Sequence, residues 1–247
     1  VKEESNPIFT SNTSLVFNWG GTSDQVQSLA STLKSRSHNE VVVDKLDFYL
    51  DYLKKGKYYM RDVYGSVPFK VSIDKSKPQL LRTLIGIKFV SETKYEVRII
   101  FENDQAETFV YNTNTSTKNG VTSGTFTKRF NLNQPTNLSF LNITIKRDDF
   151  LGNYVGQEYF IKFNRFDDIV TRYRGIKTTI DKNAQSIVKL SLEGTNKNRL
   201  VDYLNETVKT IVKAQLDRKN QFATNTIAFI DSTLLAMEDK LKDNEDE

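Results

Sequence analysis

The stretch Leu190-Ser191-Leu192-Glu193-Gly194-Thr195-Asn196 decides the fold, because it joins a short apolar strand to a very long helix. Leucine alternates with other residues before the Gly-Thr-Asn turn, which is typical of a strand that ends there. Asn196 is the predicted N-cap, since its side chain can accept a hydrogen bond from the first helical turn. The segment 200–241 contains neither Gly nor Pro. We therefore expect one helix over 196–245, and about 45 helical residues would span roughly 65–70 Å at about 1.5 Å per residue.

Two apolar stripes divide this predicted helix. The first is a seam suited to packing on a sheet: Val201, Leu204, Val208 and Ile211. Continued at the same spacing of three and four residues, the seam reaches Gln215 and Arg218 and therefore becomes polar. A heptad-like stripe follows, shifted by one residue: Ala223, Ile227, Ile230, Leu234, Met237 and Leu241.

Two interpretations of the second stripe remain open. In one, the whole helix lies on its own domain. In the other, its distal half packs against neighbouring subunits or a second helix, because a body of this size cannot cover a helix of roughly 65 Å. The second interpretation predicts an oligomer interface formed by Ile227, Ile230, Leu234 and Met237.

The rest of the chain predicts helices first and strands afterwards. Thr22-Ser23-Asp24 begins a helix that carries Leu29 and Leu33, and a second helix is expected over 39–55. From about residue 66 the pattern alternates instead, and the predicted strands are Val67–Ile73, Ile85–Val90, 95–101, Glu107–Tyr111, Thr125–Phe130, Leu138–Ile145, Gln157–Phe163 and Ile187–Leu192.

This order of elements predicts an α+β fold: a mixed or antiparallel sheet body with N-terminal helices and one very long C-terminal helix. We expect a core α/β part over 1–75 and 166–200, with a strand-rich insertion over 76–165. The Asn-, Thr- and Ser-rich stretch Asn112–Gly124 is predicted to be a surface loop.

Composition excludes several classes of protein. The 247 residues include no cysteine, so disulfides, thiolate metal sites and cysteine nucleophiles are absent. The 35 basic and 31 acidic residues are interspersed, without the basic face of a nucleic-acid binder. Hydrophobic residues make up 38%, and no run approaches the length of a membrane span. Since Val1 is not Met and Glu247 falls within the helical pattern, we expect a segment of a longer protein.

No catalytic, cofactor or metal site is predicted. His38 is the only histidine, and no G-x-S-x-G turn accompanies it, which argues against a Ser-His-Asp triad. Asp148-Asp149 and Asp167-Asp168 could supply glycosidase carboxylates, but adjacent acids more often cap turns. The segment 120–124 lacks the lysine of a phosphate-binding loop.

Three stretches of the chain, taken in order, are similar to segments of a known protein family. The first comprises 33–37, 41–46 and Tyr49. The second is Asp62-Val63-Tyr64-Gly65-Ser66-Val67-Pro68-Phe69-Lys70-Val71, which is similar to an E-L-Y-x-x-S-P-F-x-V segment. The third runs from Leu190 to Leu235 and includes 191–196, 203–205, 223–226 and 229–230.

Together they resemble the periplasmic domain of polysaccharide co-polymerases, the family of Wzz-type chain-length determinants and larger transmembrane tyrosine autokinases, in a form similar to Bacteroidetes members. The likeness covers roughly 25–75 and 170–240. Lys197 departs from the proline that the family often has in the first helical turn. The residues that match the family motifs are Pro68, Gly194, Asn196, Leu204, Asn205 and Phe229.

The resemblance implies a domain on the periplasmic face of the bacterial inner membrane, with a membrane helix before Val1 and another after the long helix. It implies a ring-like homo-oligomer that influences the length or export of a surface polysaccharide. Its expected partners are the polymerase or export machinery and the nascent polysaccharide. The periplasmic domain of the family catalyses nothing and needs no cofactor, and any tyrosine kinase lies on the cytoplasmic side.

An alternative is an extracytoplasmic carbohydrate- or adhesion-binding module. Its contacts would be Trp19, the only tryptophan, and the stretch Asn112–Gly124. Such a tryptophan is more often a core or interface anchor than a platform for a sugar ring.

Overall fold

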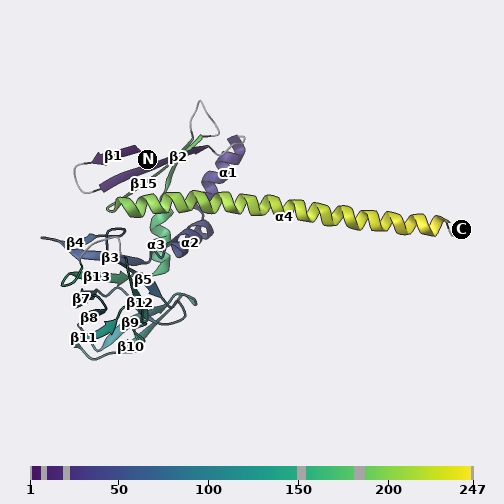
Figure 1. Cartoon of the computed structure of the whole chain (residues 1–247). Helices are drawn as coiled ribbons and strands as arrows, with labels where there is room; N and C mark the ends of the chain where they lie inside the picture. Colours follow the sequence, from purple (N-terminus) through teal and green to yellow (C-terminus); the bar gives the residue numbers. More distant parts are fainter. Residues whose placement is uncertain (1, 7–9, 19–22, 149–153, 181–186, 246–247) are drawn as a thin grey trace.

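The computed structural model describes residues 2–6, 10–18, 23–148, 154–180 and 187–245. A body of sheets and short helices lies at one end of the molecule, and one helix projects far beyond it (Figure 1). No helix in the described ranges is both long and apolar enough to cross a membrane.

Four helices and fifteen strands are present among the described residues. The helices are α1 (Ser23–Lys34), α2 (Arg36–Lys45), α3 (Phe166–Tyr173) and α4 (Lys197–Glu245). The strands of the first half are β1 (Lys2–Asn6), β2 (Thr10–Asn18), β3 (Leu50–Lys55), β4 (Met60–Asp62), β5 (Phe69–Ile73), β6 (Gln79–Leu80), β7 (Ile85–Phe89) and β8 (Lys94–Phe101). The remaining strands are β9 (Gln105–Val110), β10 (Thr115–Gly120), β11 (Gly124–Asn131), β12 (Ile143–Arg147), β13 (Glu158–Phe163), β14 (Lys177–Ile180) and β15 (Ile187–Gly194).

These strands form four sheets whose described pairs are antiparallel. The largest has six strands in the order β11-β8-β7-β13-β3-β4. A four-stranded sheet has the order β1-β2-β15-β14, and smaller sheets join β10-β9-β6 and β12-β5. The predicted α+β class, with a long C-terminal helix, is therefore confirmed.

Strand β8 shows how the alternating pattern specifies the large sheet. Tyr95, Val97 and Ile99 are fully buried, whereas Arg98 and Ile100, which alternate with them, are exposed. Since a slip of one residue would send the buried set to solvent, burial fixes the register of this strand.

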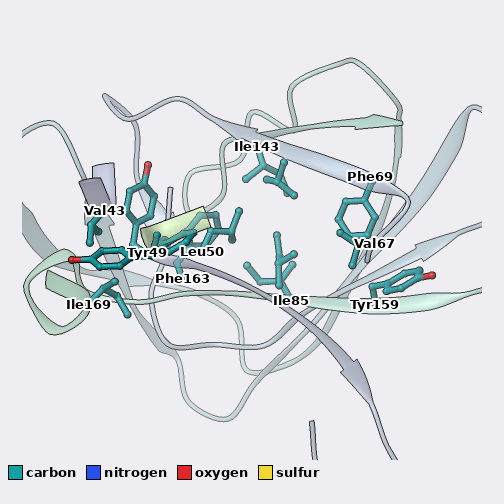
Figure 2. Packing of buried hydrophobic residues seen from close by; sticks show 14 of the residues in the cluster. Val43, Tyr49, Leu50, Val67, Phe69, Ile85, Ile143, Tyr159, Phe163 and Ile169 are labelled. Carbon is teal, nitrogen blue, oxygen red and sulfur yellow. The ribbon is translucent and has the colours of Figure 1, made fainter. Parts of the chain in front are cut away.

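The hydrophobic core lies between the sheets and continues to α2 and α3. Figure 2 shows Phe69, Val67 and Tyr159 grouped at one end, with Tyr49, Leu50 and Phe163 at the other. Phe69 packs edge-on against Tyr159 with ring centroids 5.5 Å apart. Such aromatic pairs add to the free energy gained by burial.

The second predicted helix, over 39–55, is wrong in its C-terminal half. Helix α2 starts at Arg36, where the Ser35 hydroxyl accepts a hydrogen bond from the His38 N–H, and it ends at Lys45. Asp47 then takes a positive φ of 50°, which turns the chain out of the helix into β3. The spacing of apolar residues after Lys45 is compatible with a helix or a strand. The strand forms because β3 pairs with β13 and β4.

The expectation for Asn112–Gly124 also needs correction. Asn112–Gly124 is not simply a loop, because Thr115–Gly120 forms β10 and pairs with β9. The large sheet joins β3 and β4 to β7, β8 and β13. It therefore spans the boundary expected near residue 75 between the core part and the strand-rich insertion.

Helix α4 lies between two parts of the body. It contacts α2 on one side and strands β2 and β15 on the other. In Figure 1 the four-stranded sheet and α1 lie on one side of α4, with α2, α3 and the other sheets on the opposite side. The first turns of α4 are thus held by both parts of the body.

Candidate functional site

The start of α4 is capped as the sequence predicts. The Asn196 Oδ1 accepts a hydrogen bond from the Arg199 N–H at 3.1 Å. The Asn196 Nδ2 donates to the carbonyl oxygens of Asp62 at 3.2 Å and Tyr64 at 3.1 Å. This one side chain therefore caps the helix and connects it to the end of β4.

Arg199, which the sequence analysis did not single out, is the centre of the helix attachment. Its side chain is 8% exposed; Nε donates to the Asp62 carboxylate at 3.0 Å, and Nη2 lies 3.6 Å from the Asp51 carboxylate. The guanidinium lies 4.9 Å from the Phe48 ring centroid and 4.6 Å from that of Tyr64. Burial alone would lower the pKa of Arg199, but Asp62, Tyr173 and Asp51 outweigh it and raise that pKa.

One signal in the sequence could have identified Arg199. A positive charge in the first turn of a helix opposes the helix dipole. An arginine there needs carboxylate partners from elsewhere, and Asp51 and Asp62 supply them.

Tyr203 attaches the next turn of α4 to the helices of the body. Its ring stacks on Tyr173 with centroids 4.3 Å apart, and its hydroxyl donates to Asn39 Oδ1. The Asn39 Nδ2 in turn donates to the carbonyl oxygens of Leu33 at 2.9 Å and Ser35 at 2.7 Å. Burial raises the pKa of Tyr173 to about 12, so this cluster stays uncharged near neutral pH.

The packed part of α4 ends at Ile211. Leu204 and Ile211 are buried, and Val201 and Val208 are half-buried, which agrees with the predicted seam. From Val212 to Glu245 the helix extends for about 50 Å more at about 1.5 Å per residue. None of the described side chains of this free part, 212–238, is buried.

The free part of α4 carries many exposed apolar side chains. Ile230 is 49% exposed, and the other predicted interface residues Ile227, Leu234 and Met237 are 57–60% exposed. Further exposed apolar side chains of this part are Val212, Leu216, Phe222, Phe229 and Leu235. Between Asn220 and Met237 the only charged residue is Asp231.

Helical spacing gathers most of these side chains on one side. Leu216 continues the heptad-like stripe toward the body, since it precedes Ala223 by seven residues. Phe222 and Phe229, also seven residues apart, line one flank of the stripe. The interpretation in which the whole helix lies on its own domain therefore fails for 212–238, whereas packing against another subunit stays a prediction.

Some of the residues that match the family motifs are buried, and others are exposed. Pro68 and Leu204 are buried, Asn205 is exposed and Phe229 is 71% exposed. Gly194 ends β15, and a Cβ there would lie 3.0 Å from Leu200 Cδ2. The turn into α4 thus requires a close approach that only glycine allows without displacement.

Two acidic groups that might have supplied chemistry, Asp167 and Asp168, have structural partners. Asp167 pairs with Arg36 at 2.6 Å, and Asp168 with Arg82 at 3.2 Å. His38 is buried, and burial together with Lys45 lowers its pKa to about 4. Within the described ranges, no three acidic or histidine side chains gather as a metal site would require.

A cleft of about 570 Å³ opens beside β8, where Arg82 and Arg98 line it together with Leu84 and Ile100. Both arginines already hold carboxylates of the body, Asp168 and Glu158. Asp149 and Trp19 lie outside the described residues.

No family model matches the chain, and no curated protein matches it either.

Proposed function

We propose that this chain is the periplasmic domain of an inner-membrane polysaccharide co-polymerase, which regulates the chain length or export of an exopolysaccharide, capsule or O-antigen through homo-oligomerisation. The observation that carries the proposal is the free part of α4, whose described side chains are all uncovered and whose stretch from Asn220 to Met237 carries one charge, Asp231. The first turns of the same helix are firmly attached to the body. The ordered resemblance of the three sequence stretches supplies the class of protein.

The contrast between the two parts of α4 supports an assembly role. A buried arginine, a helix cap and a tyrosine cluster attach its first turns to the body and fix the direction of the helix. Large exposed apolar patches on soluble proteins mark interaction sites. A rigidly held helix with such a patch suits repeated packing between copies of one chain, because each copy presents the patch in the same orientation.

Charge substitution tests the interface. In Ile230→Asp and Leu234→Asp a carboxylate would have to be buried between subunits, so we expect weaker self-association. Ser232→Asp adds the same charge to the opposite side of the helix and serves as the matched control. Sedimentation velocity reports assembly, and thermal melting reports the fold.

Loss of assembly with an unchanged melt in the two stripe variants alone supports the interface. A lower melting temperature without any change in assembly would contradict it. The function is tested in cells with the full-length protein, where both stripe variants should shift the length distribution of the surface polysaccharide. An unchanged distribution, or a full-length sequence without a membrane span on each side, would refute the co-polymerase proposal.

A further inference from the structure

The β3–β4 hairpin ends in a basic and aromatic tip, Lys54-Lys55-Gly56-Lys57-Tyr58-Tyr59-Met60-Arg61, here called the β3–β4 tip. It carries four basic residues and no acidic one. The Gly56 N–H donates to the Tyr59 carbonyl oxygen at 2.9 Å, which closes the turn. Figure 1 shows β3 and β4 on the side of the body away from the free end of α4.

The positive charge of the tip is not neutralised by the body. None of the ion pairs among the described residues uses Lys55, Lys57 or Arg61. The carboxylates nearest in sequence, Asp51 and Asp62, are held by Arg199. The tip therefore presents its charge to solvent.

Two of the basic residues oppose each other directly. Lys54 and Arg61 are cross-strand partners in the antiparallel β3–β4 pair, so their side chains lie on the same face. Like charges in that position destabilise a sheet. Lys54 is partly compensated, since its Nζ donates to Gln157 Oε1 at 3.0 Å and lies 5.0 Å from the Tyr159 ring centroid. An anion at the tip would relieve the remaining repulsion.

The apex is aromatic as well as basic. Tyr58 is 82% exposed and Tyr59 is 54% exposed. The Lys57 Nζ lies 5.1 Å from the Tyr58 ring centroid, so cation and ring point to the same region. A ring that is four-fifths exposed stands on a convex apex, whereas a polymer chain is better held in a groove with walls.

We propose that the β3–β4 tip binds a surface of anionic lipid headgroups. Lysine and arginine are attracted to such a surface, and tyrosine rings favour the boundary between headgroups and acyl chains. A convex tip can meet a flat bilayer without any conformational change. The proposal is independent of the polysaccharide role, because it requires only an anionic bilayer within reach of the chain.

Vesicle flotation of the chain tests this binding. At about 0.1 M salt we expect binding to vesicles of phosphatidylcholine with roughly a third phosphatidylglycerol, and much weaker binding at higher salt. The triple variant Lys55→Gln, Lys57→Gln, Arg61→Gln should lower the partition coefficient on the order of 100-fold, about 5-fold for each charge. Tyr58→Ser should weaken binding without changing its salt dependence.

A control with the same change in net charge separates the tip from general attraction. Lys146→Gln, Lys209→Gln, Lys213→Gln removes three exposed lysines elsewhere and should change the partition coefficient by less than about 3-fold. Vesicles of phosphatidylcholine alone report any binding by the apolar free part of α4.

Three results would overturn the proposal. The first is no preference for anionic vesicles, and the second is an equal loss of vesicle binding in both triple variants. The third is a tip variant that loses binding to an acidic polysaccharide but keeps its binding to anionic vesicles. The last result would assign the tip to a polymer. Polysaccharide length in cells is a separate measurement, so failure of this proposal and of the co-polymerase role can be told apart.

Discussion

Replacing Arg199 with methionine tests how α4 is held by the body. The substitution keeps an apolar chain between the rings of Phe48 and Tyr64 and removes the guanidinium. The carboxylates of Asp51 and Asp62, each 17% exposed, then lose their shared partner. The carbonyl oxygens of Phe48 and Leu50 lose a donor as well.

The expected cost follows from this geometry. Removing one member of a buried ion pair costs about 3–5 kcal/mol, because the remaining charge loses its main partner. Asp51 then keeps Lys162, 3.8 Å away, and the Asn164 amide, while Asp62 keeps the Asn196 amide. For a chain of this length each kcal/mol lowers the melting temperature by about 2–4 °C, so Arg199→Met should melt about 6–20 °C lower. Urea denaturation gives the same free energy independently.

Two further variants make the result specific. Arg199→Met combined with Asp62→Asn removes one of the two stranded charges and should recover at least about 1 kcal/mol of the loss. Arg218→Met, at an exposed position of the same helix, should change the free energy of unfolding by less than about 0.5 kcal/mol. A loss below about 1 kcal/mol for Arg199→Met, with no recovery in the double variant, would refute the role of Arg199 as the anchor.

Two more predictions concern the root of α4 and the only histidine. Asn196→Ala should lower the free energy of unfolding by about 1–2 kcal/mol in urea, because it removes the cap and the hydrogen bonds to Asp62 and Tyr64. Asn205→Ala, exposed on α4, is the control, and equal losses would contradict the capping role. His38 has a pKa of about 4 in the folded chain against 6.5 in the unfolded chain, so the unfolded state takes up a proton first as pH falls. Stability should therefore drop by about 2 kcal/mol between pH 6.5 and 5, and a His38→Gln variant with the same slope would disprove this cause.

The sequence predicted correctly those elements that depend on interactions between residues close together in the chain. The Asn196 cap depends on atoms within one turn, and the length of α4 depends on the absence of Gly and Pro over 200–241. The alternation of Tyr95, Val97 and Ile99 likewise identified β8.

Elements that depend on distant partners were missed. The segment after Lys45 has a spacing compatible with a helix, but β3 forms there because β13 and β4 complete its hydrogen bonds. Strand β10 is polar throughout and has no apolar period; its pairing with β9 makes it a strand. Arg199 was overlooked because its carboxylate partners lie more than 130 residues earlier in the chain.

By itself, the sequence determined that a long unbroken helix begins at Asn196 and that its apolar stripe changes register near Gln215. Only the tertiary structure decided how much of that helix the body covers, and that coverage ends at Ile211. The physical reason is that periodicity records which side chains avoid water, whereas burial requires a partner surface that distant segments assemble. The second stripe of α4 finds no such surface among the described residues of this chain, which is why its partner is proposed to be another copy.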